Sequence, residues 1–486
     1  MKQSKRFARG IFWSLVGTVA WKVSILAAAV IVARFLGKAG FGEYAMIQST
    51  MVVLGIFAGF GLGLTNTKYV AELKTKDPQR LGRLTGLCNL VAVATGLALT
   101  LAFLLAAPWL AARTLNAPHL APYLQVGALS LIPSALLGVQ TGTLSGFQAF
   151  RTSARVNLLT GGLTLPLTVV MVYLMGLMGA MLALLVSSLA GAMLALRAVR
   201  QECANHGIVL VYRGSWAERR TLWDFSLPAL LAASLATPAT WAANAILANQ
   251  PNGYAELGLF NAANQFRMFL VFLPFIVGMV VVPTLSELHG DNNAAHFTRL
   301  VNLNLKATWS FSLALGFVVI GLSPWLIRLY GSQFIEGGVV LALMVVVTVL
   351  NVASQTIGQA LVGAGRMWAG CIMNFGWAMV LIIFVLILVP AHGAFGMAIA
   401  YLISYLCHTG WSLLYAAGKF GRKCANSSLL LLLSTALGLG LALGSQRIAG
   451  PWFLSLSIIL AGIASFWIWR LIPREKLRSL WQAEGV

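Results

Sequence analysis

The sequence predicts an all-α polytopic membrane protein with about fourteen transmembrane helices. Three observations predict this fold class. Apolar stretches of roughly 20 residues, each long enough to cross a bilayer core as a helix, recur from end to end. Only 9% of the 486 residues are charged and 59% are hydrophobic, which excludes an ordinary water-soluble domain. Nearly all basic residues lie in alternate gaps between the apolar stretches.

The expected spans are separated by short polar gaps. We place the spans at approximately 10–33, 43–66, 85–112, 123–145, 154–175, 177–197, 225–248, 259–285, 304–327, 338–361, 368–390, 394–417, 427–446 and 452–470. Even the two longest gaps are too small to bury the core of a soluble catalytic domain. The sequence therefore predicts that the membrane part is the functional part and that the chain is not an enzyme.

The lysines and arginines predict the orientation. With the N-terminus in the cytoplasm, 26 of the 33 lie in cytoplasmic gaps and five on the opposite side, while Lys22 and Arg267 lie inside spans. This is the positive-inside distribution, and it predicts a multi-pass protein of the bacterial cytoplasmic (inner) membrane with both termini cytoplasmic. The net charge of +21 is then a topology signal, so no nucleic-acid partner is expected.

The chain also repeats. Six residues recur unchanged 217 positions later, and they are Gly146, Asn157, Gly176, Gly179, Ala183 and Ser187. A repeat unit of six spans returns the chain to the same side of the membrane, so the two halves should have parallel orientation. We expect six-helix lobes at 1–220 and 221–420, followed by two additional helices and a cytoplasmic tail at 421–486.

Two spans carry glycine at every fourth position. Gly55, Gly59 and Gly63 share one face of the second span, and Gly138, Gly142 and Gly146 share one face of the fourth. That spacing predicts close approach of helix backbones on both faces.

Motifs for catalysis, cofactors or metals are missing from the sequence. It has no P-loop, no HExxH and no acidic cluster with metal-binding spacing, and its five cysteines are scattered. No cofactor or metal site is expected. All twelve acidic residues fall in gaps or at span ends, which argues against an exporter that binds a cation at a buried carboxylate.

The charges at membrane depth are cationic. Lys22 lies about halfway along the first span, and Arg267 lies within the eighth. A charge at a helix centre costs about 2.5–3.5 kcal/mol, so such residues are either functional or reach the interface by snorkelling. An unpaired cationic cavity predicts an anionic ligand such as a phosphate group. Uncharged hydrogen-bonding side chains suited to a sugar-bearing ligand also fall in the spans, and those chosen as cavity lining are Gln48, Asn66, Asn157, Asn264 and Asn374.

Three segments resemble one family. Ala33–Tyr44, with the sequence ARFLGKAGFGEY, resembles the A-R-x-L-G-x-x-x-F-G-x-Y signature of Wzx-type polysaccharide flippases. Gly61–Glu72 and Leu273–Glu287 are also similar to that family. The family belongs to the multidrug/oligosaccharidyl-lipid/polysaccharide exporter superfamily, and the resemblance extends over essentially the whole chain.

The resemblance implies alternating access between two lobes around a central cationic cavity. The cavity would accept the pyrophosphate-sugar head of a polyprenyl-pyrophosphate-linked oligosaccharide, a repeat unit of O-antigen, capsule or exopolysaccharide. By position, Lys22 and Arg267 match the family's cations on the first and eighth helices, and Lys68 would serve at the cytoplasmic mouth. The implied partners are the lipid-linked oligosaccharide, membrane lipids and a polysaccharide polymerase or chain-length machinery.

Three alternatives stay open at this point. A lipid II flippase of peptidoglycan synthesis would use the same cationic chemistry, although the segment Phe41–Tyr44 favours the polysaccharide branch. A cation-coupled multidrug exporter is disfavoured because no carboxylate lies within a span. A polysaccharide polymerase or ligase would typically need a large external loop, which this sequence lacks.

The charge distribution predicts that Val486 lies in the cytoplasm. Alkaline phosphatase fused after Val486 should therefore be inactive, whereas the same reporter fused near Arg113, in an expected external gap, should be active. Phosphatase activity from the Val486 fusion would contradict the topology.

Overall fold

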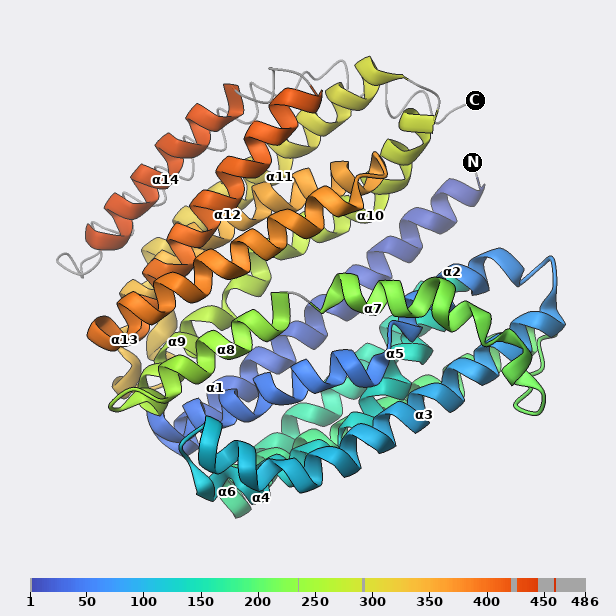
Figure 1. The fold of residues 1–486 in the computed structure, drawn as a ribbon, viewed down its shortest axis with the longest axis horizontal. Coiled ribbons are helices and arrows are strands. Elements are labelled where there is room, and N and C mark those ends of the chain that lie inside the picture. The colour runs from blue at the N-terminus through green and yellow to red at the C-terminus, as the bar shows by residue number, and fades with distance from the viewer. Residues whose placement is uncertain (1, 235, 291–292, 421–425, 445–458, 460–486) are drawn as a thin grey trace. The chain divides into compact units, whose positions relative to one another are not determined.

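The computed structural model is helical throughout and describes residues 2–234, 236–290, 293–420, 426–444 and 459 (Figure 1). These residues contain no strand. The chain divides into two compact units, Met1–Asn249 and Gln250–Val486. Each unit is described separately below.

The first unit is built around α1 (Lys2–Gly59), which consists of two helices joined at Gly37 (φ 70°, ψ −177°), and its partners. Its other helices are α2 (Leu62–Leu73), α3 (Pro78–Trp109), α4 (Ala121–Ala128), α5 (Leu131–Gly146), α6 (Phe150–Asn205), α7 (Leu227–Ala233) and α8 (Ala236–Ala248). α1 packs along α6, and α5 packs against α2, α3 and α6. α8 also packs on α1, where Trp241 Nε1 donates a hydrogen bond to Thr50 Oγ1 at 2.9 Å.

The second unit surrounds a buried central helix. Its helices are α9 (Gly253–Gln265), α10 (Arg267–Gly290), α11 (Ala294–Arg328), α12 (Gly337–Gly363), α13 (Met367–Phe420) and α14 (Asn426–Gly444). α12 is buried along nearly its whole length, because α9, α10, α11, α13 and α14 all pack against it. The first part of α12, 337–347, is apolar on every side, as is expected of a helix in the core of a bundle.

The helices account for the expected spans. The described residues of each of the first thirteen spans fall on helical segments, some of them interrupted by a short turn. The fourteenth, 452–470, lies outside the described residues apart from Ile459, so a total of fourteen stays a prediction. Among the described residues, seven helices are long and apolar enough to cross a membrane, or eight if Pro118–Ala128 and Leu131–Gly146 form one bent span. The protein is therefore a multi-pass membrane protein.

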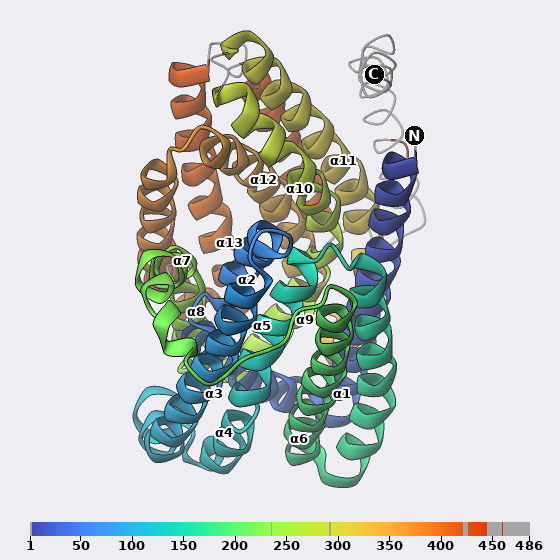
Figure 2. The same ribbon diagram turned by 90° about the vertical axis from the view of Figure 1, so that its right-hand side faces the viewer.

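Two of the longest helices double back at a glycine (Figure 2). The backbone of α6 turns at Gly176 (φ 56°, ψ −132°), and that of α13 turns at Gly393 (φ 52°, ψ −131°). Just beyond these turns, Gly179 lies against the carbonyl oxygen of Met171, and Gly396 lies against that of Leu388. Residues eight apart in a straight helix are about 12 Å apart, so α6 and α13 are both helical hairpins.

The hairpins show that the structure repeats as the sequence does. Gly176 and Gly393 are 217 positions apart and have nearly identical backbone angles. Gly146 packs against Val70, and Gly363 packs against Leu285, so both sides of this contact recur at the sequence offsets. The lobe boundaries at 220 and 420 stay a prediction. The boundary between the compact units follows α8, since α8 packs in the first unit.

The glycine stripes are partly as expected. Gly63 and Gly142 face each other across α2 and α5, and Gly146 lies against Val70 and Thr67, so the close approach is confirmed there. The expectation for Gly55 and Gly59 is wrong, because a Cβ at either position would meet nothing within 4 Å. The spacing places the glycines on one face of a helix, but it does not determine which segment packs against that face.

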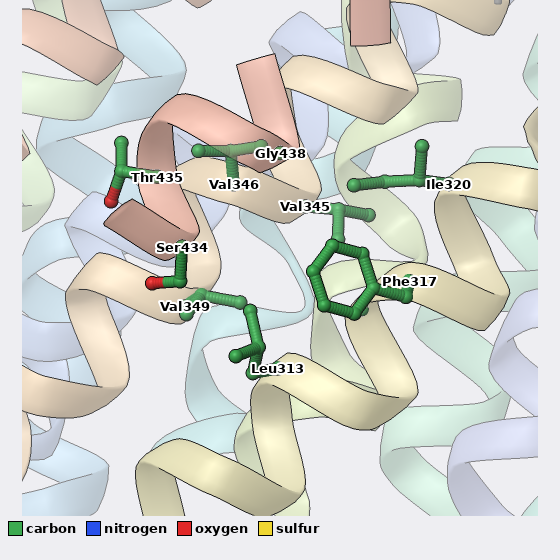
Figure 3. Close-up of a pocket in the computed structure, with 10 residues that line it drawn as sticks. Leu313, Phe317, Ile320, Val345, Val346, Val349, Ser434, Thr435 and Gly438 are labelled. Carbon is green, nitrogen blue, oxygen red and sulfur yellow. The ribbon is translucent and has the colours of Figure 1, made fainter. Parts of the chain in front are cut away.

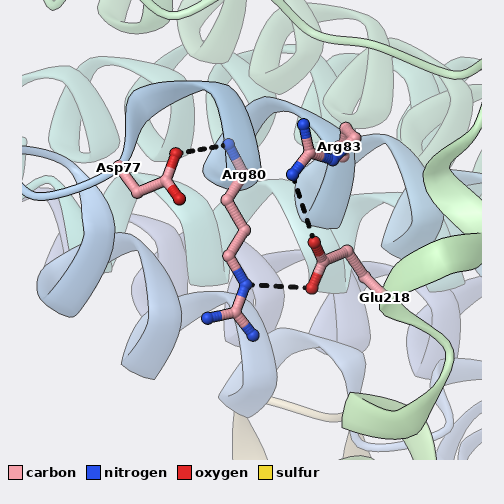
Figure 4. A network of polar contacts seen from close by, with 4 residues as sticks. All are labelled: Asp77, Arg80, Arg83 and Glu218. Carbon is pink, nitrogen blue, oxygen red and sulfur yellow. Dashed lines mark hydrogen bonds and ion pairs between the residues drawn. The ribbon is translucent and has the colours of Figure 1, made fainter.

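The segment that links α6 to α7 is fastened to α3. Gly82 and Gly86 of α3 lie against the carbonyl oxygens of Val209 and Val211, and the Val211 N–H donates to Gly82 O at 3.2 Å. Farther along, Glu218 binds both Arg80 (3.0 Å) and Arg83 (3.5 Å) (Figure 4). Asp77 caps α3 by accepting the Arg80 N–H at 2.9 Å. These contacts hold the linker on the first unit.

The two hairpin glycines predict a specific stability cost. Gly176→Ala and Gly393→Ala should each lower the free energy of unfolding by roughly 1–3 kcal/mol, because an L side chain rarely adopts these angles. Gly393→Ala should cost more, since its Cβ would meet the Glu256 carboxylate at 2.7 Å. Thermal unfolding in detergent measures both. Gly162→Ala and Gly410→Ala, at glycines with open space in the same helices, should cause no loss; equal losses in all four variants would contradict the assignment.

Candidate functional site

The strongest candidate site is centred on Arg267, at the break between α9 and α10 of the second unit. α9 ends at Gln265, and α10 begins at Arg267 after a single turn residue, Phe266. The break places the arginine at the start of a new helix and next to the buried helix α12. The side chain is half-buried.

Two neutral oxygen atoms hold the guanidinium. Arg267 Nε donates to Thr348 Oγ1 of α12 at 2.9 Å, and Nη1 donates to Asn264 Oδ1 of α9 at 3.1 Å. The Thr348 hydroxyl in turn donates to Met344 O at 2.6 Å, so its orientation is set by its own helix. The structure thus brings together two residues that the sequence singled out, Arg267 and Asn264, and adds Thr348.

An aromatic wall completes the surroundings of Arg267. The guanidinium carbon lies 6.0 Å from the centre of the Tyr405 ring, at the outer limit of a cation–π contact. Tyr405 packs on Trp377 (5.3 Å between ring centres), and Trp377 packs on Tyr401 (6.4 Å). Tyr401 packs on Phe260 of α9 (5.6 Å). Both arms of the α13 hairpin therefore support the ring beneath the guanidinium.

The charge of Arg267 is not neutralised within the described part of the chain. Its described partners are a hydroxyl, an amide oxygen and an aromatic ring, and no described carboxylate forms an ion pair with it. A half-buried cation held only by neutral groups retains its attraction for an anion. Chemically, this arrangement can bind a phosphate or carboxylate group.

Lys22 has different surroundings in the first unit. α1 meets α6 along a stripe on which Gly17 contacts Ala154, and Trp21 and Ser24 contact Gly161. Lys22 lies beside this stripe and is half-buried. No hydrogen bond or ion pair joins its ammonium to a described residue.

Lys68 is exposed and lies near two aromatic rings. Its ammonium is 4.6 Å from the ring centre of Phe225 and 5.0 Å from that of Tyr69. Next to it, Thr65 Oγ1 and Ser226 Oγ share a buried hydrogen bond of 2.7 Å. These contacts join α2 to the segment that leads into α7, so Lys68 has a structural role besides any at a cavity mouth.

The other predicted cavity residues are divided between the two units. Asn66 donates to Thr143 at 2.8 Å and joins α2 to α5, while Gln48 donates to Tyr44 one turn earlier in α1 at 2.7 Å. Asn157 is half-buried in α6, and its repeat partner Asn374 is exposed in α13. Lys22 and Lys68 belong to the first unit and Arg267 to the second, so a cavity shared by all three stays a prediction.

A small pocket in the second unit lies between α11, α12 and α14 (Figure 3). Phe317 and Ile320 come from α11, Val345 and Val349 from α12, and Ser434 from α14. The lining contains no charged residue, so this pocket does not provide an anion site. In the described chain no group of three or more histidines, cysteines or acids could hold a metal ion.

The sequence alone missed Thr348 and Tyr405. Thr348 is the one hydroxyl in an otherwise apolar run, Val345–Leu350, and this isolation was the available signal. Tyr405 gave no signal, because a tyrosine in an apolar helix is equally typical of packing.

Comparisons with known proteins agree with this architecture. A family model described as "Polysaccharide biosynthesis protein" matches residues 7–289. The lipid III flippase of Escherichia coli (strain K12) is 26% identical over 416 residues, which cover 82% of this chain and 96% of that protein. The EPS I polysaccharide export inner membrane protein EpsE of Ralstonia nicotianae is 25% identical over 411 residues, covering 80% and 88%.

Solved structures share the fold. The lipid II flippase MurJ in an inward closed conformation superposes with a TM-score of 0.73 at 14% identity, covering 96% of this chain and 100% of that one. An inward-facing multidrug resistance transporter of the MATE family, from the MOP superfamily, gives a TM-score of 0.69 at 16% identity, covering 85% and 99%.

Proposed function

Because the chain belongs to the polysaccharide biosynthesis protein family, we propose that it is a flippase for a polyprenyl-pyrophosphate-linked oligosaccharide. It would translocate the repeat unit of an O-antigen, capsule or exopolysaccharide across the bacterial cytoplasmic membrane by alternating access between its two halves. The relatives named lipid III flippase and polysaccharide export protein support this substrate class. The proposal assigns transport only, with no bond made or broken.

The observation that carries the proposal is the arrangement around Arg267. A guanidinium at membrane depth, held by Thr348 and Asn264 and unpaired with any described acid, is suited to an anionic head group. The pyrophosphate of the lipid-linked substrate is such a group. Lys22 would add a second positive charge from the first unit, and Lys68 would meet the head group at the cytoplasmic end.

The described acids also fit a carrier whose site is cationic. Glu218 binds Arg80 and Arg83, and Glu202 accepts from Thr152 at 2.7 Å. Glu43 contacts His119 at 2.8 Å, and Glu256 accepts the Ala394 N–H at 2.9 Å. Carboxylates engaged in such structural contacts are poor candidates for an obligatory coupling site, so we propose that no single acid binds the coupling ion.

The second candidate is a lipid II flippase, which the fold likeness to MurJ over 96% of the chain favours. Both substrates carry a polyprenyl pyrophosphate, and they differ in the attached head group. Purified protein in liposomes, supplied separately with lipid-linked oligosaccharide and with lipid II, would separate them. Translocation of lipid II alone would replace the main proposal with this one.

Removing either deep cation should impair transport. We expect Arg267→Gln to lower lipid-linked oligosaccharide translocation in liposomes by roughly 10–100-fold, the size of a lost hydrogen bond to a charged group. Lys22→Gln should have a smaller effect in the same direction. Lys22→Arg should retain substantial transport, and Arg267→Lys should retain some, because lysine has charge without the bidentate fork.

The control is Arg299→Gln, which removes an exposed positive charge from the same unit as Arg267. Its translocation rate should equal that of the wild type. If Lys22→Gln and Arg267→Gln also match the wild type at equal membrane levels, the cationic site is not used.

A further inference from the structure

We propose that Thr348 and Asn264 are positioning residues that fix which edge of the Arg267 guanidinium meets the two oxygens of a phosphoryl group. This inference rests on the proposed function, because it concerns the same site. It goes further by assigning a role to a hydroxyl that carries no charge, and by identifying a bidentate phosphoryl group as the ligand chemistry.

Thr348 determines the rotation of the guanidinium about its side chain. Its Oγ1 accepts the only hydrogen of Arg267 Nε, at 2.9 Å. Thr348 is fully buried in α12, and its own hydrogen is directed at Met344 O. The hydroxyl can therefore act only as an acceptor toward the arginine. The buried helix α12 holds it in place.

Asn264 provides the second fixed point. Its Oδ1 accepts from Nη1 at 3.1 Å across the α9–α10 break. Bonds to two different nitrogens define the plane of a guanidinium, which is rigid and flat. Tyr405 lies next to the same guanidinium, with its ring centre 6.0 Å from the guanidinium carbon.

The donors that remain define the ligand. A guanidinium has five N–H groups, of which Thr348 and Asn264 engage one each. The Tyr405 hydroxyl also interacts with the guanidinium. At least two donors are left, and because Nε is engaged they belong to the terminal nitrogens, whose spacing matches two oxygens of one phosphoryl group. A ligand with a single acceptor atom would engage only one of these donors.

The repeat shows that the set of contacts to Arg267 is present in only one half of the chain. At the matching offsets, Arg267 corresponds to Met51, Thr348 to Leu131 and Tyr405 to Ser188. Asn264 and Tyr405 have polar counterparts, but Gln48 donates to Tyr44 and Ser188 donates to Leu185 O instead. The first half thus lacks the cation and the Thr348 hydroxyl, and its helix runs unbroken past Met51, where the second half breaks at Phe266.

The test is binding of geranyl pyrophosphate, a short soluble polyprenyl pyrophosphate, to the detergent-purified full chain by calorimetry. Thr348→Val should raise the dissociation constant roughly tenfold, and Thr348→Ser should restore it to within about twofold of the wild type. Geraniol, which lacks phosphate, should bind the wild type and Thr348→Val alike. In liposomes, Thr348→Val should raise the KM for lipid-linked oligosaccharide more than it lowers the maximal rate.

Thr356→Val is the matched control. Thr356 is also buried in α12 and donates to the carbonyl four residues earlier, Val352 O at 2.9 Å, but it bonds to Thr308 rather than to Arg267. Its pyrophosphate affinity should stay at the wild-type value. In an Arg267→Gln background, Thr348→Val should have no further effect, because Thr348 acts through the guanidinium.

The outcomes separate this inference from the proposed function. If the wild type translocates lipid-linked oligosaccharide but Thr348→Val and Thr356→Val bind pyrophosphate equally well, the positioning role is wrong and the proposed function stands. If the wild type translocates nothing but its pyrophosphate affinity depends on Thr348 as described, the anion site stands and the transport proposal fails.

Discussion

Every polar group of this chain that lies in hydrocarbon must find its partner within the protein, because lipid offers none. Backbone groups meet this constraint by forming helices, and many hydroxyls meet it by bonding back to a carbonyl one turn earlier, as Thr143 does to Val139 and Ser404 to Ala400. The same constraint shapes the site of Arg267. A deep cation needs acceptors, and the chain supplies neutral ones, so the charge is fixed in place without being cancelled.

Reversing direction inside such an environment requires turns that leave few groups unpaired. The hairpins of α6 and α13 achieve this with one glycine each, at backbone angles that other residues rarely adopt. At the second turn the Glu256 carboxylate accepts the Ala394 N–H that the turn would otherwise leave free. The counterpart of Glu256 in the first half is Gly40, so the two turns share geometry and differ in their support.

The spans and the repeat could be predicted from the sequence because bilayer thickness fixes the length of an apolar run and duplication preserves spacing. Arg267 and Asn264 could be singled out because polar residues in an apolar stretch are conspicuous, and their role in binding stays a prediction. Thr348 and Tyr405 could not, since which face a helix presents to its neighbours is decided by packing between distant segments. For the same reason Gly55 and Gly59 were assigned a close contact that they do not make, while Gly63 was assigned one that it does.

The two halves differ at the position of the charged site. Arg267 corresponds to Met51, which lies inside an unbroken helix rather than after a break, and Thr348 corresponds to Leu131. A leucine accepts no hydrogen bond, so an arginine at Met51 would lack the acceptor that Thr348 gives to Arg267. The Arg267 guanidinium and the Thr348 hydroxyl therefore function only together. The two halves differ in this pair of residues rather than in the charge alone.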